Sequence, residues 1–534
     1  MRIGLVAAAA VATVSMGAAD AAAHAAYDPS EKSIAQLEAD MAAGRVTAEQ
    51  LVGAYLDRIR RLDRAGPRLQ SVIALNPSAL ADARALDAER RKTGPRGPLH
   101  GIPLLLKDNI ETKDAMPTTA GSLALKDNVT HRDAPLAAKL RAAGAIILGK
   151  TNLSEWANIR SSSSISGWSA IGGLTKNPYV LDRNACGSSA GSGTATAASL
   201  AAAAIGTETD GSVICPSSIS GIVGLKPTVG LVSRSRVVPI SVSQDTAGPM
   251  ARNVADAAAL LNVIAGSDPT DPATAEADAH RTDYTAALSK PSLKGVRLGV
   301  FHVEGGGASA ATAEAFGAAV AVLKAQGAEV IELKPVKVPD AIGEDELTVL
   351  LTELKSGMNA YLATTGAKTR TLADVIAFNR ANQRETVLFG QDLFEKADAT
   401  TGDATKARAE SRDFARATLD KLLGDNKLDA LITASGSPSW RIDVLRGDRD
   451  AGESASLPAV AGYPHLTVPM GYVQGLPVGI SFIGAAWSDA KLLAIGNAYE
   501  QASHKRVAPR FIPSLESTPE NSQAFAPQPQ VIPK

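Results

Sequence analysis

The sequence predicts an α/β protein in which helices cover a β-sheet that contains parallel strands. Three observations support this fold class. Short, wholly apolar segments are typical of strands buried on both faces of a sheet. These segments alternate along the chain with segments that have the apolar spacing of amphipathic helices. Hydrophobic residues make up 45% and charged residues 20% of the 534 residues, as in an ordinary globular protein with a large core.

The N-terminus has the pattern of a secretory signal peptide. A positive start is followed by a mostly apolar run from Ile3 to Met16 and then by small residues. The tripeptide Ala23-His24-Ala25 fits the cleavage site of such a peptide. We therefore expect residues 1–25 to be removed and the rest of the chain to be exported, to the periplasm or the extracellular medium. The alternative is an Ala-rich start of a cytosolic helix.

The elements of the first half begin with two helices. Apolar residues from Ile34 to Leu62 recur at helical spacing, with a break at Gly44-Arg45. Thr47 is placed as the N-cap of the second helix, with Gln50 as its capping-box partner. The elements predicted next are a buried strand at 102–106, a helix at 135–143, a strand at 145–148, a Gly/Ser-rich loop at 187–193 and a helix at 194–204.

The second half continues the alternation. A strand, a helix and a strand at 296–301, 311–326 and 329–333 form a βαβ unit, which implies parallel strands with a helix packed over them. Further strands are predicted at 428–433, 466–469 and 478–483, followed by a helix at 489–502. The tail from Pro513 is rich in Pro, Gln and Ser, and we expect it to be disordered.

The charge balance excludes some classes of function. The chain has 54 basic and 55 acidic residues, a formal net charge of -1. This balance predicts no broad electrostatic footprint for nucleic acid or for an anionic membrane. After the N-terminus no run of about 18 apolar residues occurs, so we expect no membrane contact once the signal is removed. The oligomeric state is not predicted.

The chain contains two cysteines, Cys186 and Cys215. Neither belongs to a Cys-x-x-Cys or Cys/His metal pattern. An exported protein can join them in a disulfide, but sequence spacing does not report whether their Cα atoms are close enough. The interpretation that we favour is two small buried thiols near the active site.

Serine chemistry requires an activated hydroxyl, a base and an oxyanion site. None of the seven histidines lies in an obvious Asp-partnered motif. Ser189 is the central residue of a G-x-S-x-G pattern at 187–191, but no clear strand leads into it, as a nucleophile elbow requires. A Ser-His-Asp hydrolase is therefore the less favoured interpretation. A P-loop is excluded because no lysine occurs between Arg183 and Lys226.

A lysine can replace histidine as the base when burial lowers its pKa. Lys107 follows the apolar run at 102–106, so a buried strand would deliver its amine to a dry interior. The alternative is an ordinary surface lysine at the end of a strand.

Four motifs together make the pattern specific. They are Gly101-Ile-Pro-Leu-Leu-Leu-Lys107, Cys186-Gly-Ser188-Ser189-Ala-Gly-Ser, Gly206-Thr-Glu-Thr-Asp-Gly-Ser212 and Gly224-Leu-Lys-Pro-Thr228. In order and spacing they resemble the amidase signature family, whose two serines are likewise 24 residues apart. The resemblance covers nearly the whole chain after the signal.

The resemblance implies a single domain, with a large mixed sheet flanked by helices on both faces. This amidase domain would span 26–512, followed by the tail at 513–534. Ser212 is implied as the nucleophile, Ser188 as a bridging serine in a cis peptide, and Lys107 as the base. No metal or organic cofactor is implied. The residues implied to form the oxyanion hole with their backbone N–H groups are Thr209, Asp210 and Gly211.

The chain departs from the common family pattern around the nucleophile. Asp210 replaces one glycine of a pair, Cys186 precedes the serine loop, and Ile214 stands where arginine is common. Asp210 either contributes to substrate or leaving-group selection or braces the turn. Trp156 and Trp168 are candidates to contact substrate, but core packing is at least as good an interpretation.

These departures, and the stretches around them, are most similar to the peptide amidase branch of the family. That resemblance implies hydrolysis of the C-terminal amide of peptides, to a carboxylate and ammonia, through an acyl-enzyme on Ser212. The alternatives are a broad aliphatic or aryl amidase or an esterase on the same site, and then a glutamine-hydrolysing amidotransferase subunit or a binding protein that has kept the fold.

Overall fold

The computed structural model describes residues 27–289, 291–306, 309–449, 454–519 and 521–526. The predicted signal peptide, residues 1–25, lies outside this range. Within it, no helix combines the length and the apolar character that a membrane crossing requires.

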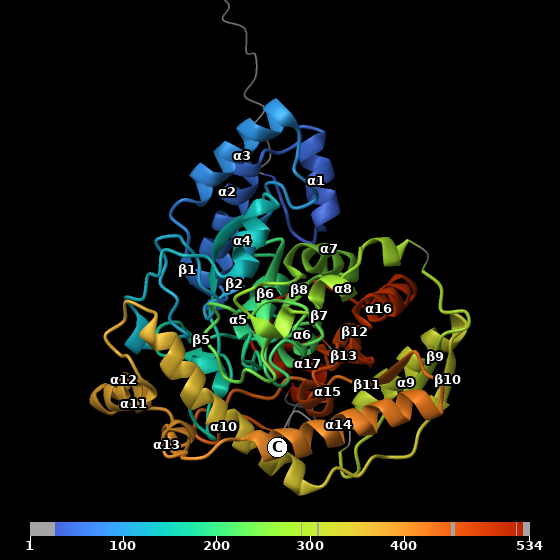
Figure 1. The fold of residues 1–534 in the computed structure, drawn as a ribbon. Coiled ribbons are helices and arrows are strands. Elements are labelled where there is room, and N and C mark those ends of the chain that lie inside the picture. Colours follow the sequence, from blue (N-terminus) through green and yellow to red (C-terminus); the bar gives the residue numbers. More distant parts are fainter. Residues whose placement is uncertain (1–26, 290, 307–308, 450–453, 520, 527–534) are drawn as a thin grey trace, which may run out of the picture.

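An 11-stranded mixed sheet runs through the middle of the molecule (Figure 1). Its strands are β1 (Val72–Leu75), β2 (Pro103–Lys107), β3 (Ile146–Thr151), β6 (Ala203–Glu208), β7 (Val223–Lys226), β8 (Thr246–Ala251), β9 (Arg297–Val300), β10 (Glu329–Glu332), β11 (Ala430–Ala434), β12 (His465–Val473) and β13 (Leu476–Ile483). Their order is β1-β3-β2-β6-β8-β7-β12-β13-β11-β9-β10. The strand β2 is parallel to β3 and β6, and β9 is parallel to β10 and β11. Antiparallel pairs join the strands between these two groups.

A two-stranded ribbon, β4 (Trp168–Ser169) and β5 (Gly173–Leu174), lies outside the large sheet. The α-helices are α1 (Ile34–Ala42), α2 (Ala48–Arg58), α3 (Ala79–Thr93), α4 (Pro135–Ala142), α5 (Ala190–Ala197), α6 (Ile214–Ile219), α7 (Val254–Ile264), α8 (Ala277–His280), α9 (Ala310–Ala325), α10 (Asp340–Ala363), α11 (Leu372–Ala381), α12 (Gln383–Thr386), α13 (Asp392–Asp398), α14 (Thr405–Asp425), α15 (Ser456–Ala461), α16 (Asp489–Ser503) and α17 (Ser522–Phe525). Short π or 3₁₀ turns occupy Ile59–Arg64, Leu123–Leu125, Glu155–Asn158, Pro272–Thr274, Ala286–Leu288 and Leu515–Ser517.

Helices cover both faces of the sheet, and strand β12 shows this directly. Its Thr467 lies over Gly479 of β13 together with Ser218 of α6. Its neighbour Leu466 lies against Gly496 of α16. Because successive side chains of a strand point to opposite faces, α6 and α16 pack on opposite sides. The predicted α/β class with a large mixed sheet between helices is therefore confirmed.

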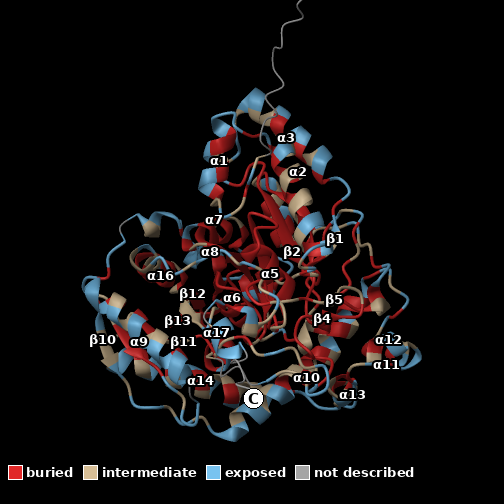
Figure 2. Cartoon of the chain, turned by 180° about the vertical axis from the view of Figure 1, so that it is seen from behind, coloured by how far each residue is buried: buried red, intermediate tan, exposed pale blue. Residues whose placement is uncertain are grey.

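Burial is concentrated in the sheet and the two short helices beside it (Figure 2). Every residue of β2 and of α5 is buried. The outer helices α1 to α3 and α10 to α14 expose one side to solvent, as amphipathic helices do. The short helices α5 and α6, and the segments just before them, are therefore surrounded by the core.

Most predicted elements lie where the sequence placed them. The strands β2, β3, β9, β10, β11, β12 and β13 and the helices α1, α2, α4, α9 and α16 match their predictions within a few residues. The capping box is also confirmed, since Thr47 Oγ1 accepts from the N–H of Gln50 at 3.1 Å and Gln50 Oε1 accepts from the N–H of Thr47 at 2.9 Å.

The helix predicted at 194–204 is wrong at both ends. Helix α5 begins at Ala190, inside the predicted loop, and β6 begins at Ala203. The glycines here serve close packing: a Cβ on Gly191 would lie 2.3 Å from the carbonyl oxygen of Ser71, and a Cβ on Gly193 would lie 2.8 Å from that of Pro216. A Gly-rich segment can therefore be a tightly packed helix, and its composition alone does not identify a loop.

The predicted disordered tail is described in part. Residues 513–519 and 521–526 include the turn Leu515–Ser517 and helix α17. Residues 527–534 lie outside the described range.

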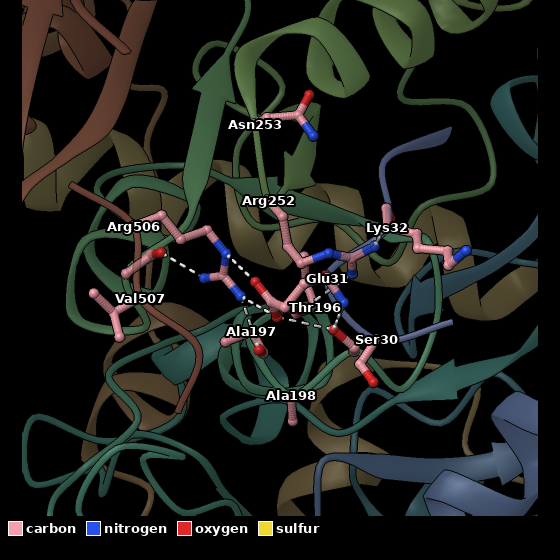
Figure 3. Close-up of polar contacts among 12 residues, drawn as sticks. Ser30, Glu31, Lys32, Thr196, Ala197, Ala198, Arg252, Asn253, Arg506 and Val507 are labelled. Atoms are coloured by element: carbon pink, nitrogen blue, oxygen red, sulfur yellow. Dashed lines mark hydrogen bonds and ion pairs between the residues drawn. The ribbon is translucent and has the colours of Figure 1, made fainter. Parts of the chain in front are cut away.

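Three arginines hold the C-terminal end of α5, and Figure 3 shows two of them, Arg252 and Arg506. Arg252 donates to the carbonyl oxygens of Thr196 and Ala201, and also to that of Lys32 at 2.6 Å. Arg506 donates to the carbonyl oxygen of Ala197 and pairs with Glu31 at 2.8 Å. Arg58 donates to the carbonyl oxygens of Ala198 and Ser199. The last carbonyls of a helix have no partner within the helix, so these contacts fix the position of α5.

Candidate active site

Three segments that are distant in the sequence meet beside β6. Lys107 is the last residue of β2, Ser188 directly precedes Ser189 and helix α5, and Ser212 lies just before α6. Ser188 Oγ lies 2.7 Å from Lys107 Nζ and 3.0 Å from Ser212 Oγ. The three residues predicted as catalytic thus form one continuous chain of hydrogen bonds.

The backbone around Ser188 is fixed from several directions. The Gly187–Ser188 peptide bond is cis, as the family resemblance implies. The carbonyl oxygen of Ser188 accepts from the N–H of Ser154 at 3.0 Å. A Cβ on Gly187 would lie 2.0 Å from Ser154 Oγ, so only glycine fits at this position. The N–H of Ser189 donates to the carbonyl oxygen of Ser212 at 3.1 Å.

Lys107 is buried and has neutral neighbours. Besides Ser188, its amine lies 3.2 Å from the carbonyl oxygen and 2.9 Å from the hydroxyl of Thr207. Burial lowers the pKa of Lys107 from its ordinary value to about 7, and the charges of Glu208 and Asp245 oppose this shift. A neutral amine has one lone pair and two N–H groups. It can donate to Thr207 and accept a proton from Ser188.

Ser212 is the member of the chain that a substrate can reach. Its exposed fraction is 8%, whereas Lys107 and Ser188 are fully buried. It lines a cavity of about 490 Å³, together with Thr209, Asp210, Ile240, Leu350 and Trp440. The cavity wall is therefore part polar and part apolar, and Lys107 is connected to it through its hydrogen bond to Ser188.

The predicted oxyanion residues form the turn that leads into Ser212. Thr209 and Asp210 line the cavity, and Gly211 has a φ of 74°, a conformation that favours glycine. The carboxylate of Glu208 braces the far side of this turn. It accepts from the N–H of Val213 at 2.7 Å, and the backbone of Gly211 also interacts with it.

Asp210, which lines the cavity, forms an acidic pair with Glu346. Burial raises the pKa of Asp210 to about 6, with a further contribution from Glu208. Burial and then the charge of Asp210 raise the pKa of Glu346 to about 8. Gln244 Nε2 donates to Glu346 Oε1 at 2.8 Å and to the carbonyl oxygen of Thr209 at 3.4 Å. Asp210 therefore faces the substrate side, and Ser456 hydrogen-bonds its carboxylate.

Sequence reasoning missed Leu350 and Trp440, which line the cavity, and Glu346, whose pKa responds to the charge of Asp210. Glu346, Leu350 and Trp440 come from parts of the chain more than a hundred residues after Ser212. No motif surrounds them, so only the fold shows their proximity.

The two tryptophans singled out in the sequence are packing residues. Trp156 packs edge-on against Phe394 with ring centroids 5.7 Å apart, and Trp168 packs against Phe389 at 5.2 Å. Both are buried, and the cavity is lined by Trp440. The core-packing interpretation is the correct one.

The expectation of two free thiols is wrong. Cys186 and Cys215 form a disulfide, with their Cα atoms 6.1 Å apart. The cysteines are 29 residues apart in the sequence, but they flank the two serines that the fold brings into contact. Their proximity is therefore a consequence of the active-site geometry.

The structure also disfavours a histidine-based site on Ser189. Ser189 is fully buried, and its hydroxyl donates to the carbonyl oxygen of Thr207 at 3.0 Å. His465 is buried elsewhere, against Ser481 at 2.6 Å, and burial lowers its pKa to about 3. Among the residues that the structure describes, no group of three or more His, Cys, Asp or Glu side chains is arranged to hold a metal ion.

Comparisons with known proteins show the family of this chain. The model of the amidase family matches residues 50–493. A "Probable amidase" of Arabidopsis thaliana is 42% identical over 483 residues, which cover 88% of this chain and 89% of that protein. The structure of native peptide amidase from Stenotrophomonas maltophilia is 50% identical, with a TM-score of 0.85, and the match covers 90% of this chain and 99% of that one. The structure of an amidase family protein from Bacillus anthracis is 36% identical, with a TM-score of 0.82, over 90% of this chain and 92% of that one.

Proposed function

The chain belongs to the amidase family and is an amide hydrolase, and from this premise we propose that it removes the C-terminal amide of peptides. The products are a free carboxylate and ammonia. The observation that supports the proposal most is the chain Lys107–Ser188–Ser212, which ends on Ser212 in a cavity of about 490 Å³. The similarity to peptide amidase along 99% of that chain supports the substrate class.

In the proposed reaction Ser212 Oγ attacks the amide carbonyl carbon. Its proton moves to Ser188 Oγ as the proton of Ser188 moves to Lys107 Nζ. The oxyanion forms opposite the turn at 209–212, where backbone N–H groups stabilise it. The relay then returns the proton to the amide nitrogen, and ammonia leaves. A water molecule hydrolyses the acyl-enzyme by the same route.

The test is ammonia release from an amidated peptide and from the same peptide with a free C-terminus. We expect release from the amide only, with the rest of the peptide intact. No release from peptide amides, but turnover of small aliphatic amides, aryl amides or esters, would assign the site to a broader hydrolase. Turnover of free glutamine alone would assign it to an amidotransferase-type activity.

Two variants test the nucleophile. Ser212→Ala is expected to lower kcat by roughly 10³-fold or more without unfolding, as loss of a catalytic nucleophile does. Ser189→Ala is the matched control, since Ser189 is adjacent but its hydroxyl hydrogen-bonds the backbone of Thr207. It should keep kcat within tenfold. The reverse pattern would restore the Ser-His-Asp interpretation.

We also propose that the chain is exported, on the basis of its N-terminal pattern. Cell fractionation with N-terminal sequencing tests this. A chain found in the cytosol with residues 1–25 intact would contradict it.

A further inference from the structure

The disulfide joins the two segments that bear the serines. Cys186 is two residues before Ser188, and Cys215 is three residues after Ser212. Cys186 also lines the substrate cavity. A covalent bond thus connects the nucleophile segment to the bridging-serine segment within a few residues of each hydroxyl.

Each end of the disulfide is tied to the backbone that presents its serine. The N–H of Cys186 donates to Asn184 Oδ1 at 2.7 Å. The N–H of Cys215 donates to the carbonyl oxygen of Gly211 at 2.9 Å, across the turn that contains Ser212. Both cysteines are 3% exposed and pack with Ile219 and Trp440. The disulfide therefore restricts the movement of one serine-bearing segment relative to the other.

The other links between these segments are weaker. They include the hydrogen bond from Ser189 N–H to the Ser212 carbonyl oxygen and the reactive contact between Ser188 and Ser212 itself. Lys107 is held separately, on β2 and against Thr207. Loss of the disulfide would therefore make the distance between Ser212 Oγ and Ser188 Oγ more variable, whereas Lys107 would stay in place.

We propose that the Cys186–Cys215 disulfide is a positioning element for catalysis, which sets the distance between Ser188 and Ser212 for proton transfer. The inference rests on the proposed function. Proton relays tolerate little misplacement, and an error of about 1 Å can cost about 100-fold in rate. Because disulfides persist in oxidising compartments, full activity would then depend on export.

The experiment compares the wild type with the double variant Cys186→Ala/Cys215→Ala. Ile219→Ala is the matched control, because Ile219 packs on the disulfide but leaves it intact. All three are assayed on a peptide amide at a temperature at which each is folded by circular dichroism. For the double variant we expect kcat to fall at least tenfold with KM within threefold. The control should have a lower Tm but a kcat within twofold of the wild type.

Labelling with a fluorophosphonate separates positioning from stability. In the double variant we expect complete labelling of Ser212 at a slower rate, because every molecule is folded but the nucleophile is less well activated. Incomplete labelling at the wild-type rate would indicate a loss of folded enzyme, and it would overturn the inference. A kcat within twofold of the wild type would overturn it too.

Should the double variant fail to fold, the wild type is reduced with dithiothreitol. Two electrons and two protons pass to the disulfide and give two cysteine thiols and oxidised dithiothreitol. Activity should fall in step with the appearance of two thiols per chain, and return on reoxidation with oxidised glutathione. Unchanged activity after the two thiols appear would overturn the inference. If the oxidised wild type releases no ammonia from any amide, the proposed function fails instead.

Discussion

At the scale of single residues, the low pKa of Lys107 reflects its burial and the lack of a carboxylate among the described hydrogen-bond partners of its amine. Lys150 and Lys226 are also fully buried. Lys150 lies 3.5 Å from the carboxylate of Asp108, and burial lowers the pKa of Lys226 only to about 8, since Glu208 and other carboxylates oppose the shift. Lys107 has hydroxyl and carbonyl partners instead. A buried lysine without an adjacent carboxylate favours the neutral form, which is the form a base requires.

The first prediction concerns pH. Burial lowers the pKa of Lys107 to about 7, so the amine is protonated below this pH and neutral above it. We expect kcat/KM on a neutral peptide amide to rise with pH and to reach half its maximum near pH 7. Lys107→Arg keeps the charge at every pH and should lose about 10²- to 10⁴-fold, the usual contribution of a general base. A wild-type profile that is flat from pH 5 to 9 would contradict the role of Lys107.

The second prediction concerns the charge at the cavity rim. With a pKa of about 6 for Asp210 and about 8 for Glu346, the pair holds one negative charge at pH 7. Asp448 and Arg449 line the same cavity with opposite charges, so Asp210 sets the balance. We expect a preference for a C-terminal arginine amide over a C-terminal glutamate amide.

In Asp210→Asn this preference, measured as the ratio of kcat/KM values at pH 7, should fall about fivefold or more, since a charge pair near a protein surface is worth about 1 kcal/mol or more. Glu346→Gln is the matched control, because it imitates the protonated form of Glu346 and should leave the ratio unchanged at pH 7. An unchanged ratio in Asp210→Asn would leave Asp210 as a brace of the turn alone.

At the scale of elements, helix α5 depends on its surroundings rather than on its sequence. Its eight residues include two glycines and two threonines, which are poor helix formers. Its C-terminal carbonyls are satisfied by Arg58, Arg252 and Arg506. The N-terminal end of α5 directly follows Ser188 and Ser189. By fixing the C-terminal end of this helix, the arginines also stabilise the position of Ser188.

The third prediction is that Arg252→Leu destabilises the protein. It leaves the carbonyl oxygens of Thr196, Ala201 and Lys32 without this donor in a buried place. The free energy of unfolding, from urea titration, should fall by about 2–4 kcal/mol, because each unsatisfied buried group costs about 1–3 kcal/mol. Arg281→Leu is the matched control, since Arg281 is exposed and its ion-pair partner, Asp278, is exposed too. Equal effects of the two variants would refute the role of the cluster.

The same elements show how far the sequence could be read. Strand β2 and Lys107 were predictable, because a short, wholly apolar run that ends at a polar residue is typical of a buried strand. The boundary between α5 and β6 was not, since an alanine-rich segment has no apolar periodicity to mark where helix ends and strand begins. The disulfide and Glu346 depend on distances between segments that only the tertiary structure fixes.

At the scale of the whole molecule, segments near the two ends of the described chain meet at the C-terminal end of α5. Glu31 pairs with Arg506, and the carbonyl oxygen of Lys32 accepts from Arg252 (Figure 3). The segment that follows the predicted signal peptide is therefore part of the fold, and it reaches the scaffold of the bridging serine through the arginine cluster.

The fourth prediction follows from this arrangement. A chain that starts at Tyr27 keeps the docking segment, and we expect the stability and kcat of the full-length protein. A chain that starts at Ser33 keeps the N-cap of α1 but loses Glu31 and Lys32, so Arg506 loses its ion-pair partner and Arg252 loses the part-buried carbonyl oxygen of Lys32. Its free energy of unfolding should fall by about 1–3 kcal/mol, because a hydrogen bond to a charged group contributes about 1.5–3 kcal/mol and an exposed ion pair contributes less. Urea titration of both chains measures this. Equal stability would contradict the docking role of the segment, whereas a loss confined to the Ser33 start would place the start of the folded enzyme between Tyr27 and Ser33.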